Sequence, residues 1–331
     1  MNQAILTFDV GGHGGRAGLV DADTGLLLRQ ADVSVDRLAS GLEPVSAFSD
    51  LLSLASAEAL DGEAPGRIVI AAPGPVSDGI VENLPTLFGG AKARVDLTRM
   101  AHGLWPASRV WSCNDLTAAG YGFVAQGHRD FLVLTCGSGI GGKLFSGGRP
   151  MLGPRGMGGE IGHWRVEGMP ELPCDCGGRG HLGGLASGRG TLRLARFRAR
   201  QDMRGYARSA LAAMAPDPEV LTARLLAEHF HAGDTWAEAI IAEAAAAIGG
   251  ALALIHLATA TETFFITGGF GTALGPRFGL MIGEAARARS WATGIDWASA
   301  VHVAEQGVEW GLIGAAHYAL TDPGAGRSLA A

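Results

Sequence analysis

The chain has 331 residues, of which 47% are hydrophobic and 18% are charged, a composition typical of a folded globular protein and not of a disordered one. A chain of this length favours two domains over a single compact core. The formal net charge of −6 argues against the basic surface that binding to nucleic acid requires.

Neither a membrane segment nor a targeting segment is predicted. The longest apolar stretch, residues 244–258, is short for a membrane span and contains Gly249, Gly250 and His256. The N-terminus enters a strand by Ala4 without a basic region or a cleavable apolar segment. We therefore expect a cytoplasmic protein that does not associate with a membrane.

The first half of the chain is predicted to contain several strands and one helix, from its apolar runs and their spacing. Its first strand ends in the run Gly11-Gly12-His13-Gly14-Gly15, and its last strand ends at Asn114-Asp115. The expected strands cover residues 4–10, 16–21, 26–33, 67–72 and 109–113, and the expected helix covers residues 44–60.

The second half repeats the order of a strand, a glycine turn and further strands. The strand at 131–135 runs into the glycine-rich turn 136–142, and glycine-rich loops are expected from 153 to 190. The alternation of strands and helices predicts the α/β class, and the repeated order indicates two related domains. The other expected elements are strands at 143–146 and 264–267 and helices at 218–230, 236–258 and 308–320.

Three glycine turns follow predicted strands, at residues 9–13, 137–141 and 267–271. A turn without Cβ atoms lets backbone N–H groups converge on phosphate oxygens. None of the three has the spacing of a P-loop or of a Rossmann turn. Together with Asp9 and Asp115 at strand ends, these turns predict a phosphate-binding site.

Several sequence runs together resemble a known family. The run Phe8-Asp9-Val10-Gly11-Gly12 resembles the first phosphate motif of the actin-like sugar kinases. Two further runs are similar to the signature of the ROK family, whose name combines repressor, open reading frame and kinase. They are Leu134–Gly142 continuing to Gly159-Glu160-Ile161-Gly162-His163, and Cys174-Asp175-Cys176-Gly177 continuing to Gly180-His181-Leu182.

The resemblance implies two ribonuclease-H-like domains of the actin-like ATPase superfamily with a cleft between them. The small domain would comprise residues 1–118 and 306–331, and the large domain residues 119–305 with a zinc loop at 163–181. The implied activity is that of an ATP-dependent, glucokinase-like sugar kinase that uses Mg²⁺. The implied acceptor is a hexose or hexose derivative, by default glucose at its 6-hydroxyl, and the implied assembly is a homodimer.

Asp115 takes the position of the family's catalytic base. A carboxylate there can accept the proton of the attacking hydroxyl, a role worth about 10²–10⁴-fold in rate. Read without the family, an Asn-Asp pair after a strand is more often the cap of a helix.

The resemblance also assigns residues that would contact the sugar and the nucleotide. The alternative is that the polar residues among them only satisfy local backbone groups. Asp9 would lie near Mg²⁺. The sugar hydroxyls would be bound by Asn83, Asn114, Asp115, Glu160 and His163. The nucleotide would be bound by Asp9, Gly11, Gly12, His13, Gly137, Ser138, Gly139, Gly268 and Gly269.

The family's zinc site uses one histidine and three cysteines. The third cysteine position is a histidine here, and the implied ligands are His163, Cys174, Cys176 and His181. Two thiolates and two imidazoles make a sound tetrahedral zinc site, which would turn the other nitrogen of His163 toward the sugar. The alternative is a loop that has lost zinc. The remaining cysteines, Cys113 and Cys136, are expected to be small buried residues.

Two departures from the family pattern bear on nucleotide and sugar specificity. His13 stands in place of a threonine, and its titration would make phosphate binding more sensitive to pH. Gly183 stands in place of a glutamate that contacts sugar hydroxyls near the anomeric carbon. Loss of that acceptor favours a sugar with a different group at that end.

Two other functions compete with the sugar kinase. A sugar-sensing repressor of the same family carries an N-terminal helix-turn-helix, and the eight residues before Asp9 leave no room for one, so no partner nucleic acid is expected. A catalytically weak, sugar-binding paralogue stays open because of His13 and Gly183.

Overall fold

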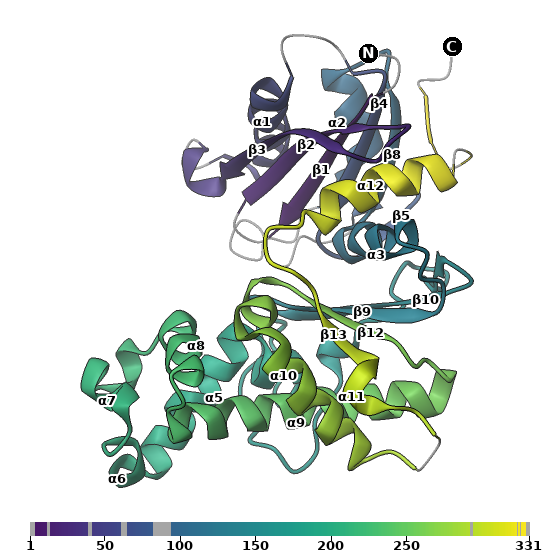
Figure 1. The fold of residues 1–331 in the computed structure, drawn as a ribbon. Helices are drawn as coiled ribbons and strands as arrows, with labels where there is room; N and C mark the ends of the chain where they lie inside the picture. The colour runs from purple at the N-terminus through teal and green to yellow at the C-terminus, as the bar shows by residue number, and fades with distance from the viewer. Residues whose placement is uncertain are drawn as a thin grey trace. The chain divides into compact units, whose positions relative to one another are not determined.

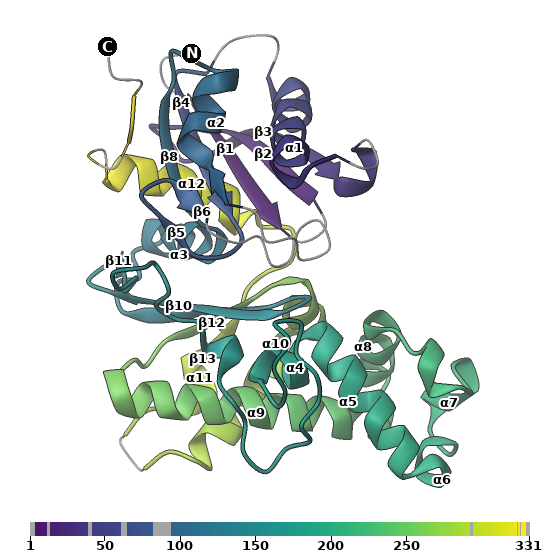
Figure 2. The same ribbon diagram turned by 180° about the vertical axis from the view of Figure 1, so that it is seen from behind.

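The computed structural model describes residues 4–11, 14–38, 42–60, 65–81, 94–291, 294–322, 324 and 326–328. The chain forms two compact units, which Figures 1 and 2 show as ribbons. The first unit comprises Met1–Arg129, Gly147–Gly158 and Glu309–Ala331, and the second comprises Asp130–Ser146 and Gly159–Val308.

The first unit is built on a five-stranded sheet with the order β3-β2-β1-β4-β8. Strands β1, β2 and β3 form an antiparallel meander, while β4 and β8 continue the sheet in parallel with β1. A small sheet of β5, β6 and β7 stands beside it. The strands of these two sheets are β1 (Ala4–Gly11), β2 (Gly14–Asp21), β3 (Leu27–Ser34), β4 (Arg67–Ala72), β5 (Val76–Ser77), β6 (Ile80–Val81), β7 (Val95–Asp96) and β8 (Arg109–Asn114). The short strand β11 (Arg149–Pro150) also belongs to the first unit but to neither of these sheets.

Helices cover both faces of this sheet because its central strands are apolar on both sides. Phe48 of helix α1 packs with Phe8 of β1 on one face, and Ala315 of helix α12 packs with the neighbouring Ile5 on the other. The elements of the first unit outside the sheets are η1 (Val35–Arg37), α1 (Pro44–Ala59), α2 (Leu97–Leu104), α3 (Asp115–Ala125) and α12 (Trp310–Thr321).

The sheet of the second unit runs β10-β9-β12-β13, with β9 and β10 antiparallel and the other pairs parallel. Its strands are β9 (Phe131–Cys136), β10 (Ile140–Ser146), β12 (Phe264–Thr267) and β13 (Val301–Val303). Its other elements are η2 (Ile161–His163), α4 (Leu182–Ala186), α5 (Gly188–Gln201), α6 (Met203–Tyr206), α7 (Ala210–Met214), η3 (Pro218–Val220), α8 (Ala223–His231), α9 (Thr235–Thr259), α10 (Gly269–Arg287) and α11 (Trp297–Ala300).

Helix α9 is the long central helix of the second unit. It spans 25 residues and is long and apolar enough to cross a membrane. The apolar stretch recognised in the sequence, residues 244–258, covers only part of this helix. However, 61% of its most apolar window is buried inside the structure. Ile241, Ile248 and Leu252 lie in the core of this unit, so the apolarity is that of a core helix.

The predicted α/β class is correct, and the expected strands have their counterparts in the structure, but several boundaries differ. Residues 119–129 and 147–158 belong to the first unit and not to the large domain, and residues 306–308 belong to the second unit. Residues 119–125 join the first unit because α3 packs along α12. The expected loop region 153–190 ends early, since α4 begins at Leu182. The helix expected from 218 is a 3-10 turn, and α8 begins only after its cap at Thr222.

The close packing of α3 on α12 depends on glycine. A Cβ atom at Gly314 would overlap the carbonyl oxygen of Ala118 and lie 2.5 Å from the backbone nitrogen of Gly122. We expect Gly314→Ala to lower the free energy of unfolding by about 1–3 kcal/mol, the usual cost of overpacking a core. Urea unfolding measures this change. Gly103→Ala in α2 is the matched control, because no atom lies within 4 Å of its added Cβ. Equal midpoints for both variants would contradict the prediction.

Candidate active site and metal centre

Asn114 and Asp115 mark the point where β8 passes into α3, as the sequence predicts. Asn114 is the N-cap of α3, and its Oδ1 accepts hydrogen bonds from the backbone nitrogens of Leu116 at 3.1 Å and Thr117 at 3.3 Å. Its amide group donates to the Gly74 carbonyl at 3.0 Å and to Asp115 Oδ1 at 2.8 Å. The sequence left open that Asp115 is the helix cap, but in the structure Asn114 is the N-cap of α3.

Asp115 is the first residue of α3, and its Oδ1 also accepts a hydrogen bond of 2.8 Å from the Leu116 nitrogen. These contacts fix the orientation of the carboxylate at a helix N-terminus, where negative charge is stabilised. Because the amide hydrogens of Asn114 are both engaged, Asn114 must release a partner to bind a sugar hydroxyl. Oδ1 of Asp115 accepts hydrogen bonds from both the Asn114 amide and the Leu116 nitrogen.

Asp9 forms part of a charged cluster that sequence reasoning missed. Its Oδ2 accepts a hydrogen bond of 2.7 Å from Arg16, which stands opposite it in the β1–β2 register. Arg16 also pairs with Glu309. Burial raises the pKa of Asp9 while Arg16 opposes the shift, and burial likewise raises the pKa of Glu309. A hairpin register counted from the glycine turn could have paired Asp9 with Arg16, but not with Glu309, which is 293 residues away from Arg16.

A cavity of about 340 Å³ lies in the first unit beside β8. Asn114, Thr117 and Tyr121 contribute to its lining, whereas Asp115 does not. We therefore do not assign it as the sugar site. Of the other predicted contacts in this unit, Gly11 ends β1, and Gly12, His13 and Asn83 lie outside the described residues.

The structure brings two of the predicted glycine turns together in the second unit. Gly137, Ser138 and Gly139 connect β9 to β10, and Gly268 and Gly269 lead from β12 into α10. Gly268 has a φ of 85°, and a Cβ atom there would lie within 3 Å of Cys136, at the end of β9. No atom lies within 4 Å of an added Cβ at Gly139 or Gly269, so the backbone of both turns is open on one side. This arrangement suits the approach of a phosphate group.

Glu160 precedes the short turn η2 in the same unit, and His163 is the last residue of that turn. His163 is exposed, and its ring meets the ring of His181 edge to face, with 5.7 Å between the centroids. Among the described residues, no side-chain hydrogen bond or ion pair engages Glu160. Gly183 is the second residue of α4, and an added Cβ there would lie 3.3 Å from the carbonyl oxygen of Gly162 in this turn.

The four predicted zinc ligands converge. One ligand atom from each of His163, Cys174, Cys176 and His181 lies within 4.8 Å of the other three. Cys176 Sγ and His181 Nδ1 are 3.2 Å apart. Tetrahedral zinc with bonds of about 2.0–2.3 Å needs ligand atoms at roughly 3.3–3.8 Å from one another, so these residues fit the ion.

Backbone hydrogen bonds hold the metal loop in shape. The Cys174 nitrogen donates to the Gly178 carbonyl at 2.9 Å, and the Gly177 nitrogen donates back to Cys174 at 2.9 Å. A side chain at position 178 would displace the His181 ring, because an added Cβ would lie 2.3 Å from the Cε1 atom of that ring. The two cysteines outside this loop are buried as predicted, and burial raises the pKa of Cys136 to about 12.

Comparison with known proteins gives the class. The model of the ROK family matches residues 5–322, and the chain belongs to this family. A C(7)-cyclitol 7-kinase from Streptomyces hygroscopicus subsp. limoneus is 38% identical over 230 residues. That match covers 67% of this chain but only 64% of the relative, slightly less than two thirds of its length.

Solved structures of the family have the same fold. A ROK family glucokinase from Streptomyces griseus, in complex with glucose and AMPPNP, matches with a TM-score of 0.74 and 27% identity over 96% of this chain and 99% of that chain. A ROK hexokinase from Thermus thermophilus matches with a TM-score of 0.70 and 28% identity over 97% and 99%. The predicted family and the two actin-like domains are thereby confirmed.

Proposed function

We propose that this protein is an ATP-dependent sugar kinase that transfers a phosphoryl group to a hydroxyl of a hexose-like acceptor. Asp115 carries the proposal, because the structure holds its carboxylate at the start of α3 in a chain of the ROK family. The similar S. griseus protein binds glucose and an ATP analogue. In this proposal Asp115 accepts the proton of the attacking hydroxyl.

The other residues bind and orient the substrates. The glycine turns at 137–139 and 268–269 offer backbone N–H groups to the phosphates of ATP, and Glu160 and His163 offer polar groups to the sugar. Asp9, fixed by Arg16, would stand near Mg²⁺, which neutralises phosphate charge when bound. Arg16 limits how freely the Asp9 carboxylate can turn toward that ion.

A coupled ATPase assay tests the proposal over a panel that contains glucose, mannose, N-acetylmannosamine and a cyclitol. A kinase should turn over at least one acceptor at about 1–100 s⁻¹. The competing function, a catalytically weak sugar-binding paralogue, requires binding of one of these sugars in calorimetry without ATP turnover. A cytoplasmic homodimer also belongs to the proposal, and light scattering after gel filtration measures its mass.

We infer that the natural acceptor differs from glucose at the end that position 183 faces. Gly183 offers no acceptor oxygen, and an added Cβ there would lie 3.3 Å from the Gly162 carbonyl oxygen, so a side chain fits after a shift of a few tenths of an ångström. The similar cyclitol kinase favours the same direction, since a carbocyclic acceptor lacks the ring oxygen and anomeric centre of glucose.

Zinc at the four-ligand cluster also belongs to the proposal, with a structural role. We expect about one zinc ion per chain in protein purified without chelator, as for a closed site. Stripping it should loosen residues 174–181 and raise KM for the sugar more than it lowers kcat, because the ion orients His163 and does not react. Metal analysis, limited proteolysis and kinetics before and after zinc is restored measure these effects. Full activity in chelator, with no metal found, would remove zinc from the proposal.

A further inference from the structure

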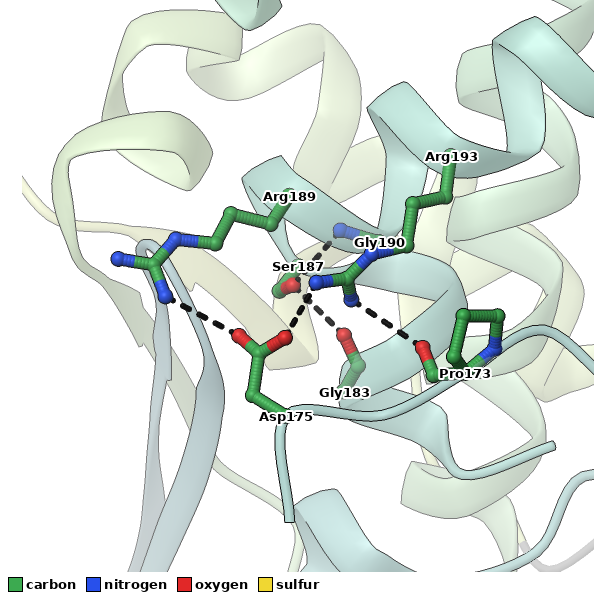
Figure 3. Close-up of polar contacts among 7 residues, drawn as sticks. All are labelled: Pro173, Asp175, Gly183, Ser187, Arg189, Gly190 and Arg193. Atoms are coloured by element: carbon green, nitrogen blue, oxygen red, sulfur yellow. Dashed lines mark hydrogen bonds and ion pairs between the residues drawn. The ribbon is translucent and has the colours of Figure 1, made fainter. Parts of the chain in front are cut away.

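The loop that carries the two cysteines is fastened to helix α5 by charged side chains (Figure 3). Asp175, which stands between Cys174 and Cys176, accepts hydrogen bonds from two arginines of α5. Arg189 Nη1 is 3.1 Å from Asp175 Oδ2, and Arg193 pairs with Asp175 Oδ1. Arg193 Nη1 also donates to the Pro173 carbonyl at 3.2 Å. The residues before and after Cys174 are thus both tied to one helix.

The first turn of α5 is itself fixed to neighbouring parts of the second unit. Ser187 caps the helix by accepting from the Gly190 nitrogen at 3.0 Å, and its hydroxyl donates to the Gly183 carbonyl at 2.6 Å (Figure 3). The Gly188 nitrogen donates to the Gly137 carbonyl at 2.8 Å. The arginines therefore project from a helix end that is anchored to α4 and to a glycine turn.

The remaining arginines of α5 do not reach the metal loop. Arg198 pairs with Glu243, and Arg200 pairs with Glu219. Arg196 donates to the carbonyl groups of Glu219 and Leu221. The arginines of α5 thus fall into two groups by their contacts. Arg189 and Arg193 bind Asp175, whereas the later arginines bind other helices and turns.

We propose that Asp175, Arg189 and Arg193 form a positioning clamp that pre-forms the metal loop before zinc binds. A loop already held in the bound shape loses less conformational entropy on binding, which raises metal affinity without any new bond to the ion. This inference rests on the zinc site of the proposed function. None of the three residues is a metal ligand. They act on zinc affinity by holding Pro173 and Asp175, the residues on either side of Cys174, against α5.

Asp175 and Arg193 carry opposite charges, so removing each of them should change zinc affinity in opposite directions if only their charge matters. A positioning role predicts the same direction for both. Arg193→Ala removes a positive charge near the site, so electrostatics alone predicts tighter binding of Zn²⁺. Asp175→Ala removes a negative charge, so electrostatics alone predicts weaker binding. A clamp predicts weaker binding in both variants, by about 10–100-fold, as is usual for residues that support metal ligands.

The experiment measures zinc affinity of the full chain by competition with a chromophoric chelator. Arg200→Ala is the matched control, because it removes an ion pair from the same helix at a site away from the metal loop, and its affinity should stay within about threefold of the wild type. The double variant Asp175→Ala/Arg193→Ala should lose less affinity than the two single losses combined, because both single variants break the shared contact between Asp175 and Arg193. The visible spectrum of the Co²⁺-substituted protein should broaden in the clamp variants and not in the control.

Arg193→Lys provides a second variant if the alanine variant is poorly folded, since a lysine keeps the charge but cannot bind Asp175 and Pro173 together. It should weaken zinc binding by an intermediate factor. A wild type that binds zinc while Arg193→Ala binds it equally or more tightly overturns the clamp and leaves the metal site standing. A wild type that binds no zinc overturns the metal site and the clamp together, while the kinase activity is judged separately by the acceptor panel.

Discussion

Replacing Asp115 by asparagine is expected to lower kcat by at least about 100-fold while leaving sugar binding nearly unchanged. The amide cannot accept the proton of the attacking hydroxyl, which is the role proposed for this carboxylate. Its carbonyl oxygen can still accept the hydrogen bond from the Leu116 nitrogen, so the start of α3 should keep its shape. The loss should therefore fall on the chemical step.

Steady-state kinetics with the best acceptor of the panel, together with calorimetry for the sugar, separate turnover from binding. Asp96→Asn is the matched control, because Asp96 is also an aspartate at a helix start of the first unit, where it caps α2 by accepting from the Arg99 nitrogen at 2.8 Å. The control should keep kcat. If Asp115→Asn turns over within a few-fold of the wild type, another group is the base.

Gly183→Glu is expected to lower KM for glucose by about tenfold or more, because each charge-assisted hydrogen bond to a sugar hydroxyl contributes about 1.5–3 kcal/mol. The added Cβ would lie 3.3 Å from the Gly162 carbonyl oxygen, so a shift of a few tenths of an ångström accommodates it. The same change should impair use of a natural acceptor that is larger at this end. The wild type should accordingly be a poor glucokinase.

KM for glucose and for the best acceptor is measured for the wild type and for two substitutions at this position. Gly183→Ala fills the same space without a carboxylate, so a gain shared by both variants would come from packing and not from hydrogen bonds. Gly66→Glu adds the same charge at an exposed position with no atom within 4 Å of its Cβ, and should change nothing. A wild type that already binds glucose tightly, and is unaffected by Gly183→Glu, would show that position 183 does not select the acceptor.

Features set by residues close together in the sequence were predictable. The ends of β1, β8, β9 and β12 were expected at glycine turns or at the Asn114-Asp115 pair, because an apolar run followed by turn residues has few other conformations. The metal cluster followed from the family resemblance, which implied His163, Cys174, Cys176 and His181 as ligands. The ligand atoms lie together in the structure.

Helices buried on all sides were harder to predict. In helix α3 every residue from Leu116 to Val124 is buried, so the helix lacks the spacing of apolar and polar residues that marks a surface helix. The start of α10 is also hard to predict from the sequence, because it contains several glycines and Pro276. Two helical pieces meet there at Gly275. The difference in the first domain boundary has the same origin, since only the packing of α3 on α12 assigns residues 119–125.

By itself the sequence determined the family, the α/β class, the positions of the main strands along the chain and the residues that carry the proposed chemistry. Only the tertiary structure decided which charges meet. It paired Arg16 with Glu309 across 293 residues, gave Asn114 the capping role, and brought Arg189 and Arg193 to Asp175. The reason is physical: turns and metal loops form from neighbouring residues, whereas an ion pair between distant residues depends on how strands and helices pack, which no local spacing encodes.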